Sequence, residues 1–276
     1  MRLAIAVLAL AGSLVWSGAA RADAPTLTVS LGDKMQVYTA AELLARPDSA
    51  TIAIPADVAY GRPMTFRAVP LLGLVSAASG PALDTIEARA SDGFVSQLPR
   101  ALIDKGASGG SVAWVAVENP AAPWPNLPGK QASAGPFYLV REHPERSGIG
   151  SEQWPYQTIA LTGVESPAHR WPQMVVDASL PADAPPRRGQ EVFTVQCLPC
   201  HRMKGAGEGE LGPDLGQPMG PTQYFTPEAL RKLIRDPKSV RTWPGQIMPG
   251  FDPAKISDSD LDAVIAYLGA IAPGPR

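Results

Sequence analysis

The stretch Cys197-Leu198-Pro199-Cys200-His201 places two cysteines two residues apart, with a histidine directly behind the second. These are the only two cysteines among the 276 residues, so this stretch holds all of the thiol chemistry of the chain. Cys-x-x-Cys-His is the attachment signature of a c-type haem, in which both thiols bond to one porphyrin and the histidine reaches the iron. We therefore predict one covalent haem, bound by Cys197 and Cys200, with His201 as an axial ligand.

Three other uses of a cysteine pair fit this sequence less well. A thioredoxin-like dithiol normally follows a strand in a βαβ pattern, whereas residues 182–193 are typical of a helix. A structural zinc ion needs four ligands, and the remaining histidines, His143 and His169, lie far away in the sequence. A disulfide across two residues would close only a very short loop. The dithiol and the disulfide stay as alternatives to the haem.

The first 22 residues have the pattern of a cleavable secretory signal peptide. Arg2 precedes an apolar run over residues 3–15, and Ala20-Arg21-Ala22 has the small-x-small form of a cleavage site. The apolar run is shorter than the roughly 20 residues that a membrane-spanning helix needs. We expect a mature chain that begins near Asp23, is located in the periplasm and does not associate with the membrane.

Composition divides the mature chain into two domains joined by a linker. Residues 166–186 read SPAHRWPQMVVDASLPADAPP, and their five prolines are typical of a stiff connector. We predict a domain over residues 23–165, a linker over 166–184 and a second domain over 185–276. Residues 23–184 carry a net charge of −5 and residues 185–276 a net charge of +1, so neither part is basic enough to suggest nucleic-acid binding.

Residues 185–276 have the pattern of a small helical domain. A first helix is expected from about Pro185 to Val195, with Asp183 as its N-cap. Thr226 and Ser257 have the pattern of N-caps for two further helices, the first of which stops before Pro237. So small a domain buries little apolar area alone, and a haem at its centre would supply the missing core.

This region resembles class I cytochrome c over residues 184–272. The segments that carry the resemblance are Gly189 and Phe193, residues 197–201, Gly212-Pro213-Asp214-Leu215, Met248-Pro249-Gly250-Phe251 and Tyr267-Leu268. The resemblance implies an all-α fold in which the first and last helices cross where Gly189 meets Tyr267. It also implies that the carbonyl of Pro213 orients His201.

The second axial ligand is expected to be Met248. It lies between prolines in the segment Trp-Pro-Gly-Gln-Ile-Met-Pro-Gly, and a loop fixed in this way can present a thioether at a set position. Its match to the family's Met-Pro-Gly pattern supports the choice. Met219 stays as an alternative, and Met203 is too close to the attachment segment to reach the opposite face of a haem. A Met and His pair raises the reduction potential of haem iron.

Residues 23–165 have the pattern of an α+β domain that is rich in strands. Alternating apolar residues between Gly and Pro positions predict strands over residues 27–31, 35–39, 51–54, 64–69, 85–90, 111–117, 137–141 and 157–164. Short helices are expected over residues 40–45 and 71–78.

The order of these segments resembles the oxidoreductase molybdopterin-binding domain of the sulfite oxidase type. The resemblance rests on residues 38–43, 66–74, 90–94 and 135–140. In that family a cysteine thiolate holds the molybdenum, whereas residues 23–184 contain no cysteine. The resemblance therefore implies a domain without its metal ligand, which we expect to be cofactor-free and to act as a docking module.

Together these patterns predict a periplasmic electron carrier with no catalytic residues of its own. The expected partners are redox proteins, namely a dehydrogenase as electron donor and an oxidase or another cytochrome as acceptor. One alternative is a redox enzyme, or the haem subunit of a sulfite-dehydrogenase-like enzyme, with a substrate site in residues 23–165. Another is a haem-based sensor or an assembly factor, which would need a labile axial ligand.

Overall fold

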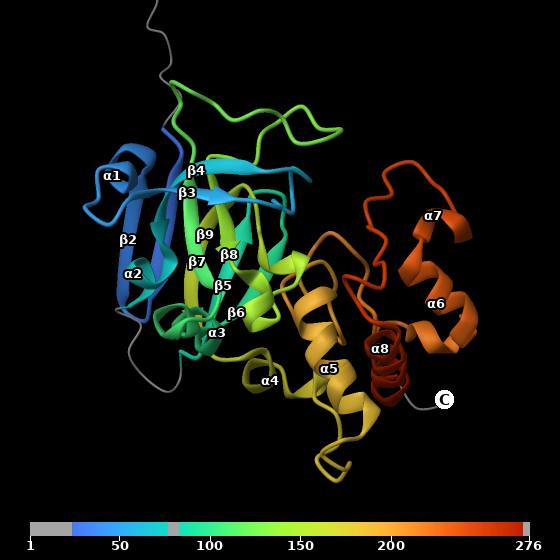
Figure 1. The fold of residues 1–276 in the computed structure, drawn as a ribbon. Coiled ribbons are helices and arrows are strands. Elements are labelled where there is room, and N and C mark those ends of the chain that lie inside the picture. The colour runs from blue at the N-terminus through green and yellow to red at the C-terminus, as the bar shows by residue number, and fades with distance from the viewer. Residues whose placement is uncertain (1–23, 77–82, 273–276) are drawn as a thin grey trace, which may run out of the picture.

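The computed structural model describes residues 24–76 and 83–272. A sheet-rich region comes first and a helical region follows it, as the sequence predicts (Figure 1). The predicted signal peptide lies outside the described residues, as do residues 77–78 of the helix that was expected over residues 71–78; within the described part this helix ends at Val75.

Two sheets form the sheet-rich region. The larger sheet has the strand order β2-β1-β9-β5-β6 and the smaller sheet has the order β3-β4-β7-β8. Among these strands β1 and β9 pair in parallel, and the other neighbours pair antiparallel. The strands are β1 (Thr26–Leu31), β2 (Lys34–Thr39), β3 (Ala50–Ile54), β4 (Met64–Pro70), β5 (Thr85–Ala90), β6 (Val95–Pro99), β7 (Val112–Val117), β8 (Phe137–Glu142) and β9 (Thr158–Val164).

Helices of this region are short and follow the strands. They are α1 (Ala40–Leu44), α2 (Leu71–Val75), α3 (Arg100–Asp104) and the 3-10 turns η1 (Lys105–Ser108), η2 (Pro144–Ser147) and η3 (Ser151–Gln153). Thr39 begins α1 in a capping box, because its hydroxyl accepts from the Glu42 amide while the Glu42 carboxylate accepts from the Thr39 amide.

Strand β8 of the smaller sheet is buried on both faces. Phe137 and Leu139 enter a core that also holds residues of the larger sheet, of α1 and of α2. Tyr138 and Val140 point to the opposite face and join a second core with Phe66 and Trp154. Since successive side chains of a strand point to opposite faces, a strand covered on both sides is apolar throughout.

The strands expected from the alternating pattern are confirmed within one or two residues, but β6 was missed. Its sequence Val-Ser-Gln-Leu-Pro carries buried polar residues that interrupt an apolar pattern. Ser96 donates to the Glu152 carbonyl at 2.8 Å, and the Gln97 side chain donates to Glu87 at 3.1 Å. Hydrogen bonds of this kind allow polar side chains to be buried, and they depend on partners far away in the sequence.

The helical region contains α5 (Pro185–Gln196), α6 (Pro227–Arg235), α7 (Pro237–Val240) and α8 (Asp258–Ile271), with the 3-10 turn η5 (Pro221–Gln223). Thr226 and Ser257 cap α6 and α8 with their hydroxyls, as predicted. The expectation that Asp183 caps α5 is wrong. The N-cap is Ala184, which has no side-chain acceptor, and Pro185 and Pro186 begin the helix instead.

The segment between the two regions also packs against the helices. It contains α4 (Pro167–Arg170) and η4 (Pro172–Met174). Met174 and Val176 are buried in the helical core, and the Tyr267 hydroxyl donates to the Met174 carbonyl at 2.7 Å. The segment was expected to act as a connector, and it contributes to the core as well.

Helices α5 and α8 cross at very short range, in the manner that the resemblance to class I cytochrome c implies. A methyl group added at Gly189 would lie 1.9 Å from the Ala263 carbonyl oxygen, so only a glycine fits there. Beside this contact the rings of Phe193 and Tyr267 lie 5.1 Å apart. The crossing fixes α5, and with it the cysteine segment that begins where α5 ends.

We predict that Gly189→Ala destabilises the helical region by about 3 kcal/mol, because the added methyl group forces α5 and α8 apart. Thermal and urea unfolding, followed by circular dichroism, measure the change.

Gly269→Ala is the matched control in the same helix pair. Nothing lies within 4 Å of a methyl group at Gly269, so this change should stabilise α8 by about 0.5 kcal/mol through helix propensity. Equal stability of the two variants would contradict the proposed role of the crossing.

Candidate functional site

Cys197 and Cys200 sit on a tight turn at the end of α5. The Cys197 amide still donates to the Phe193 carbonyl, and the His201 amide donates to the Cys197 carbonyl, both at 2.9 Å. Both cysteines are free thiols. This turn brings both sulfur-bearing residues to the wall of one cavity.

The environment of the thiols does not suit a redox dithiol. Burial raises the pKa of Cys197 and of Cys200 to about 12 each, and the nearby Glu152 carboxylate adds to the effect. A reactive Cys-x-x-Cys pair instead needs a lowered thiol pKa, as positive neighbours or a helix N-terminus provide. These cysteines lie at the C-terminal end of a helix and close to acidic groups, which favours the haem over the dithiol.

His201 is held in the form that a metal ligand needs. Its Nδ1 lies 2.8 Å from the Pro213 carbonyl oxygen, which can only accept a hydrogen bond, so Nδ1 carries the proton. The Nε2 atom of the neutral ring is then free to bind a metal. Burial lowers the pKa of His201, which favours this neutral ring, and the bond to Pro213 partly offsets that effect. A carbonyl behind a ligand histidine is a common orienting partner.

Gly212 lets the His201 ring lie flat against the backbone. A methyl group added at Gly212 would lie 2.4 Å from the Cε1 atom of the ring and 2.5 Å from Nδ1. The Gly212 amide also donates to the Cys200 carbonyl at 2.8 Å, so the segment that carries Pro213 is tied to the attachment turn.

Met248 lines the same cavity, in the irregular segment between α7 and α8. It is half-buried and packs against the helical core. Met203 and Met219 are not among the described residues that line this cavity. Met203 is fully buried in the core, and Met219 is 46% exposed at the surface. The cavity therefore brings together the four residues that the sequence singled out.

The cavity has the size and the lining for a large flat apolar cofactor. Its volume is about 920 Å³, within the range of roughly 300–1,000 Å³ that small-molecule and cofactor pockets have. Leu230, Ile234, Val264 and Leu268 supply much of its apolar wall. The residues present thus fit a haem bonded at Cys197 and Cys200.

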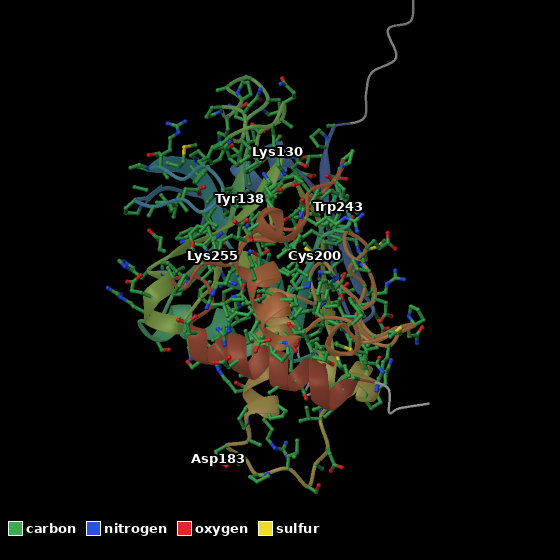
Figure 2. All side chains as sticks on the ribbon, turned by 90° about the vertical axis from the view of Figure 1, so that its right-hand side faces the viewer. Lys130, Tyr138, Asp183, Cys200, Trp243 and Lys255 are labelled. Carbon is green, nitrogen blue, oxygen red and sulfur yellow. The ribbon has the colours of Figure 1, made fainter. Side chains whose placement is uncertain are left out.

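Sequence reasoning missed that the sheet-rich region also lines this cavity. Residues of the β5–β6 turn and of the segment 151–156 contribute to its wall, and Lys130 lies at it as well. Figure 2 labels Lys130, Cys200 and Trp243, three lining residues from distant parts of the chain. The aromatic cluster Trp154-Pro155-Tyr156 is the signal in the sequence that comes nearest to marking this wall.

Comparison with known proteins shows a similarity to one protein family in the region that carries the cysteines. Residues 186–272 match the family model of cytochrome c. This match supports a c-type cytochrome domain in the C-terminal part of the chain. The family implies a covalently bound haem c and electron transfer, in agreement with the cavity and its cysteines. A search of curated proteins returned no match to the chain. The resemblance of residues 23–165 to a molybdopterin-binding domain stays a prediction.

Within residues 24–76 and 83–272, no three or more His, Cys, Asp and Glu side chains gather in a way that could hold a metal ion. No helix in the same ranges is long and apolar enough to cross a membrane.

We predict that Gly212→Ala disturbs the His201 side of the cytochrome domain, because the methyl group would occupy the space of the ring. The haem-loaded variant should show a weakened or lost low-spin absorption spectrum compared with wild type.

Gly269→Ala again serves as the control, because it adds the same methyl group in open space. A wild-type spectrum and wild-type thermal stability for Gly212→Ala would show that His201 does not depend on this contact.

Proposed function

We propose that this protein is a periplasmic electron carrier with one haem per chain. Cys197 and Cys200 attach the haem, and His201 and Met248 are its axial ligands. When bound, the haem supplies an iron that changes between Fe(II) and Fe(III). The observation that carries the proposal is the convergence of these four side chains on one cavity in a domain of the cytochrome c family.

Two features of the site suit an electron carrier, namely the tautomer of His201 and the thioether of Met248. The Pro213 carbonyl holds His201 in the tautomer that can bind iron. Met248 offers a soft, neutral sulfur, which stabilises the reduced state and raises the reduction potential. If His201 and Met248 both bound the iron, no position would remain for a substrate, and the chemistry supplied at the site would be outer-sphere electron transfer.

The proposed location and partners follow from the sequence. The pattern of residues 1–22 supports export, and the net charge of −5 on residues 23–184 gives the sheet-rich region a surface that can steer a partner of opposite charge. We propose that this region selects the redox partner, a dehydrogenase donor or an oxidase or cytochrome acceptor.

Met248→Ala tests the ligand assignment. Wild type should have sharp low-spin bands when reduced, and the ferrous protein should not bind carbon monoxide. The variant loses the thioether, so it should become high-spin and bind carbon monoxide. Absorption spectra of protein produced with haem attachment, oxidised and reduced, measure both properties.

Met219→Ala is the matched control, because Met219 is an exposed methionine away from the cavity. It should keep the wild-type spectrum. A normal spectrum for Met248→Ala together with a changed spectrum for Met219→Ala would reverse the assignment. Binding of carbon monoxide by wild type would contradict the electron carrier and favour a sensor or an enzyme.

A further inference from the structure

The sheet-rich region closes the cavity on the side of the attachment turn. Six of its lining residues come from two segments, the end of β5 with the β5–β6 turn and residues 152–156, which begin within η3. They are Ala90, Asp92, Phe94, Glu152, Trp154 and Tyr156. Figure 1 shows α5 and the turn after it between the sheets and α8.

One direct hydrogen bond and one close packing contact hold this region against α5 and the attachment turn. The Val95 amide, at the start of β6, donates to the carbonyl of Pro199 at 3.1 Å, and Pro199 lies between the two cysteines. Gly150 packs closely on the last residue of α5, and an added methyl group would lie 2.4 Å from the side-chain Nε2 atom of Gln196. The Ser96 hydroxyl bonds to the Glu152 carbonyl at 2.8 Å and so ties η3 to β6.

Charged side chains also connect the larger sheet to α4 and to the segment that follows the attachment turn. Arg170 donates to Glu87 at 3.0 Å and to Gln97 at 2.8 Å, and both partners are buried residues of the larger sheet. Arg89 of β5 forms an ion pair with Glu208, which follows the attachment segment. The bonds of Arg170 are partly buried and charge-assisted, so they fix α4 against the larger sheet more firmly than the more exposed pair of Arg89 and Glu208 fixes its segment.

The aromatic side chains of the two lining segments are fixed in place. Gly93, with φ of +92°, makes the turn that presents Phe94, and the Phe94 amide donates to the Asp92 carboxylate at 3.1 Å. The Lys130 ammonium lies 4.5 Å from the centre of the Tyr156 ring and bonds to its hydroxyl. Trp154 is buried and packs beside Tyr138 at a ring distance of 6.5 Å.

A flat apolar cofactor needs apolar cover on more than one side, and the helical core provides only part of it. We propose that Phe94, Trp154 and Tyr156 of the sheet-rich region form a second wall of the haem pocket, which keeps water from the haem and raises its reduction potential. This inference rests on the proposed function, because it requires the haem. It gives the sheet-rich region a role inside the redox site, in addition to partner selection.

The physical reason for the effect on the potential is the charge of the oxidised iron. Water and other polar surroundings stabilise Fe(III) more than Fe(II), so removing an apolar wall favours the oxidised state. Phe94 and Tyr156 are half-buried, and shortening them should open the pocket while leaving the buried Trp154 in place.

The test is a redox titration of the full-length haem-loaded protein carrying Phe94→Ala and Tyr156→Ala together. We expect the Fe(III)/Fe(II) equilibrium to shift about tenfold towards Fe(III), which corresponds to a potential lowered by about 59 mV. The Soret circular dichroism band, which reports the contacts of the haem, should change as well. Phe94→Leu with Tyr156→Phe keeps the apolar wall and should retain the wild-type potential.

Tyr38→Ala is the matched control, since Tyr38 is a half-buried aromatic residue on β2 that does not line the cavity. A potential and a Soret circular dichroism band of the double Ala variant equal to those of Tyr38→Ala would overturn the proposal. If the double variant does not accumulate, Tyr156→Ala alone decides by the same comparison. The haem content of wild type, measured first as the pyridine haemochrome, separates the outcomes: a wild type without haem refutes the proposed function itself.

Discussion

The contact between Gly189 and the Ala263 carbonyl is the constraint on which the site depends. It brings α5 and α8 to a distance that no larger residue allows, and it thereby fixes where α5 ends. The attachment turn begins at that end, and Val264 and Leu268 of the same α8 form part of the cavity wall. Two elements far apart in the sequence thus set the position of the thiols and the shape of the space in front of them.

Around this crossing, the remaining parts of the site are held by backbone groups. The Pro213 carbonyl orients His201, and the Val95 amide bonds to the carbonyl of Pro199 within the attachment turn. Backbone partners do not change rotamer or charge, so they give a rigid frame to a site whose side chains are small or flexible. A rigid frame suits electron transfer, because little reorganisation is then needed when the iron changes its charge.

A feature of the fold or of the site could be predicted from the sequence when residues close to it in the chain determine it. The cysteine motif, the caps at Thr226 and Ser257 and most strands depend on neighbours within a few residues, and they were found. Strand β6 was missed because its polar residues are satisfied by distant partners. The burial of Met174 and the aromatic wall at Trp154 were also missed, because both come from packing between segments that lie far apart in the sequence.

The most direct test of the central claim is the intact mass of the purified chain under denaturing conditions. The account predicts the mass of the polypeptide plus one haem, retained after acidic acetone extraction, and the mass of the polypeptide alone for a variant with both Cys197→Ser and Cys200→Ser. A wild-type chain without added mass after production with haem attachment, or with a disulfide between Cys197 and Cys200, would contradict it.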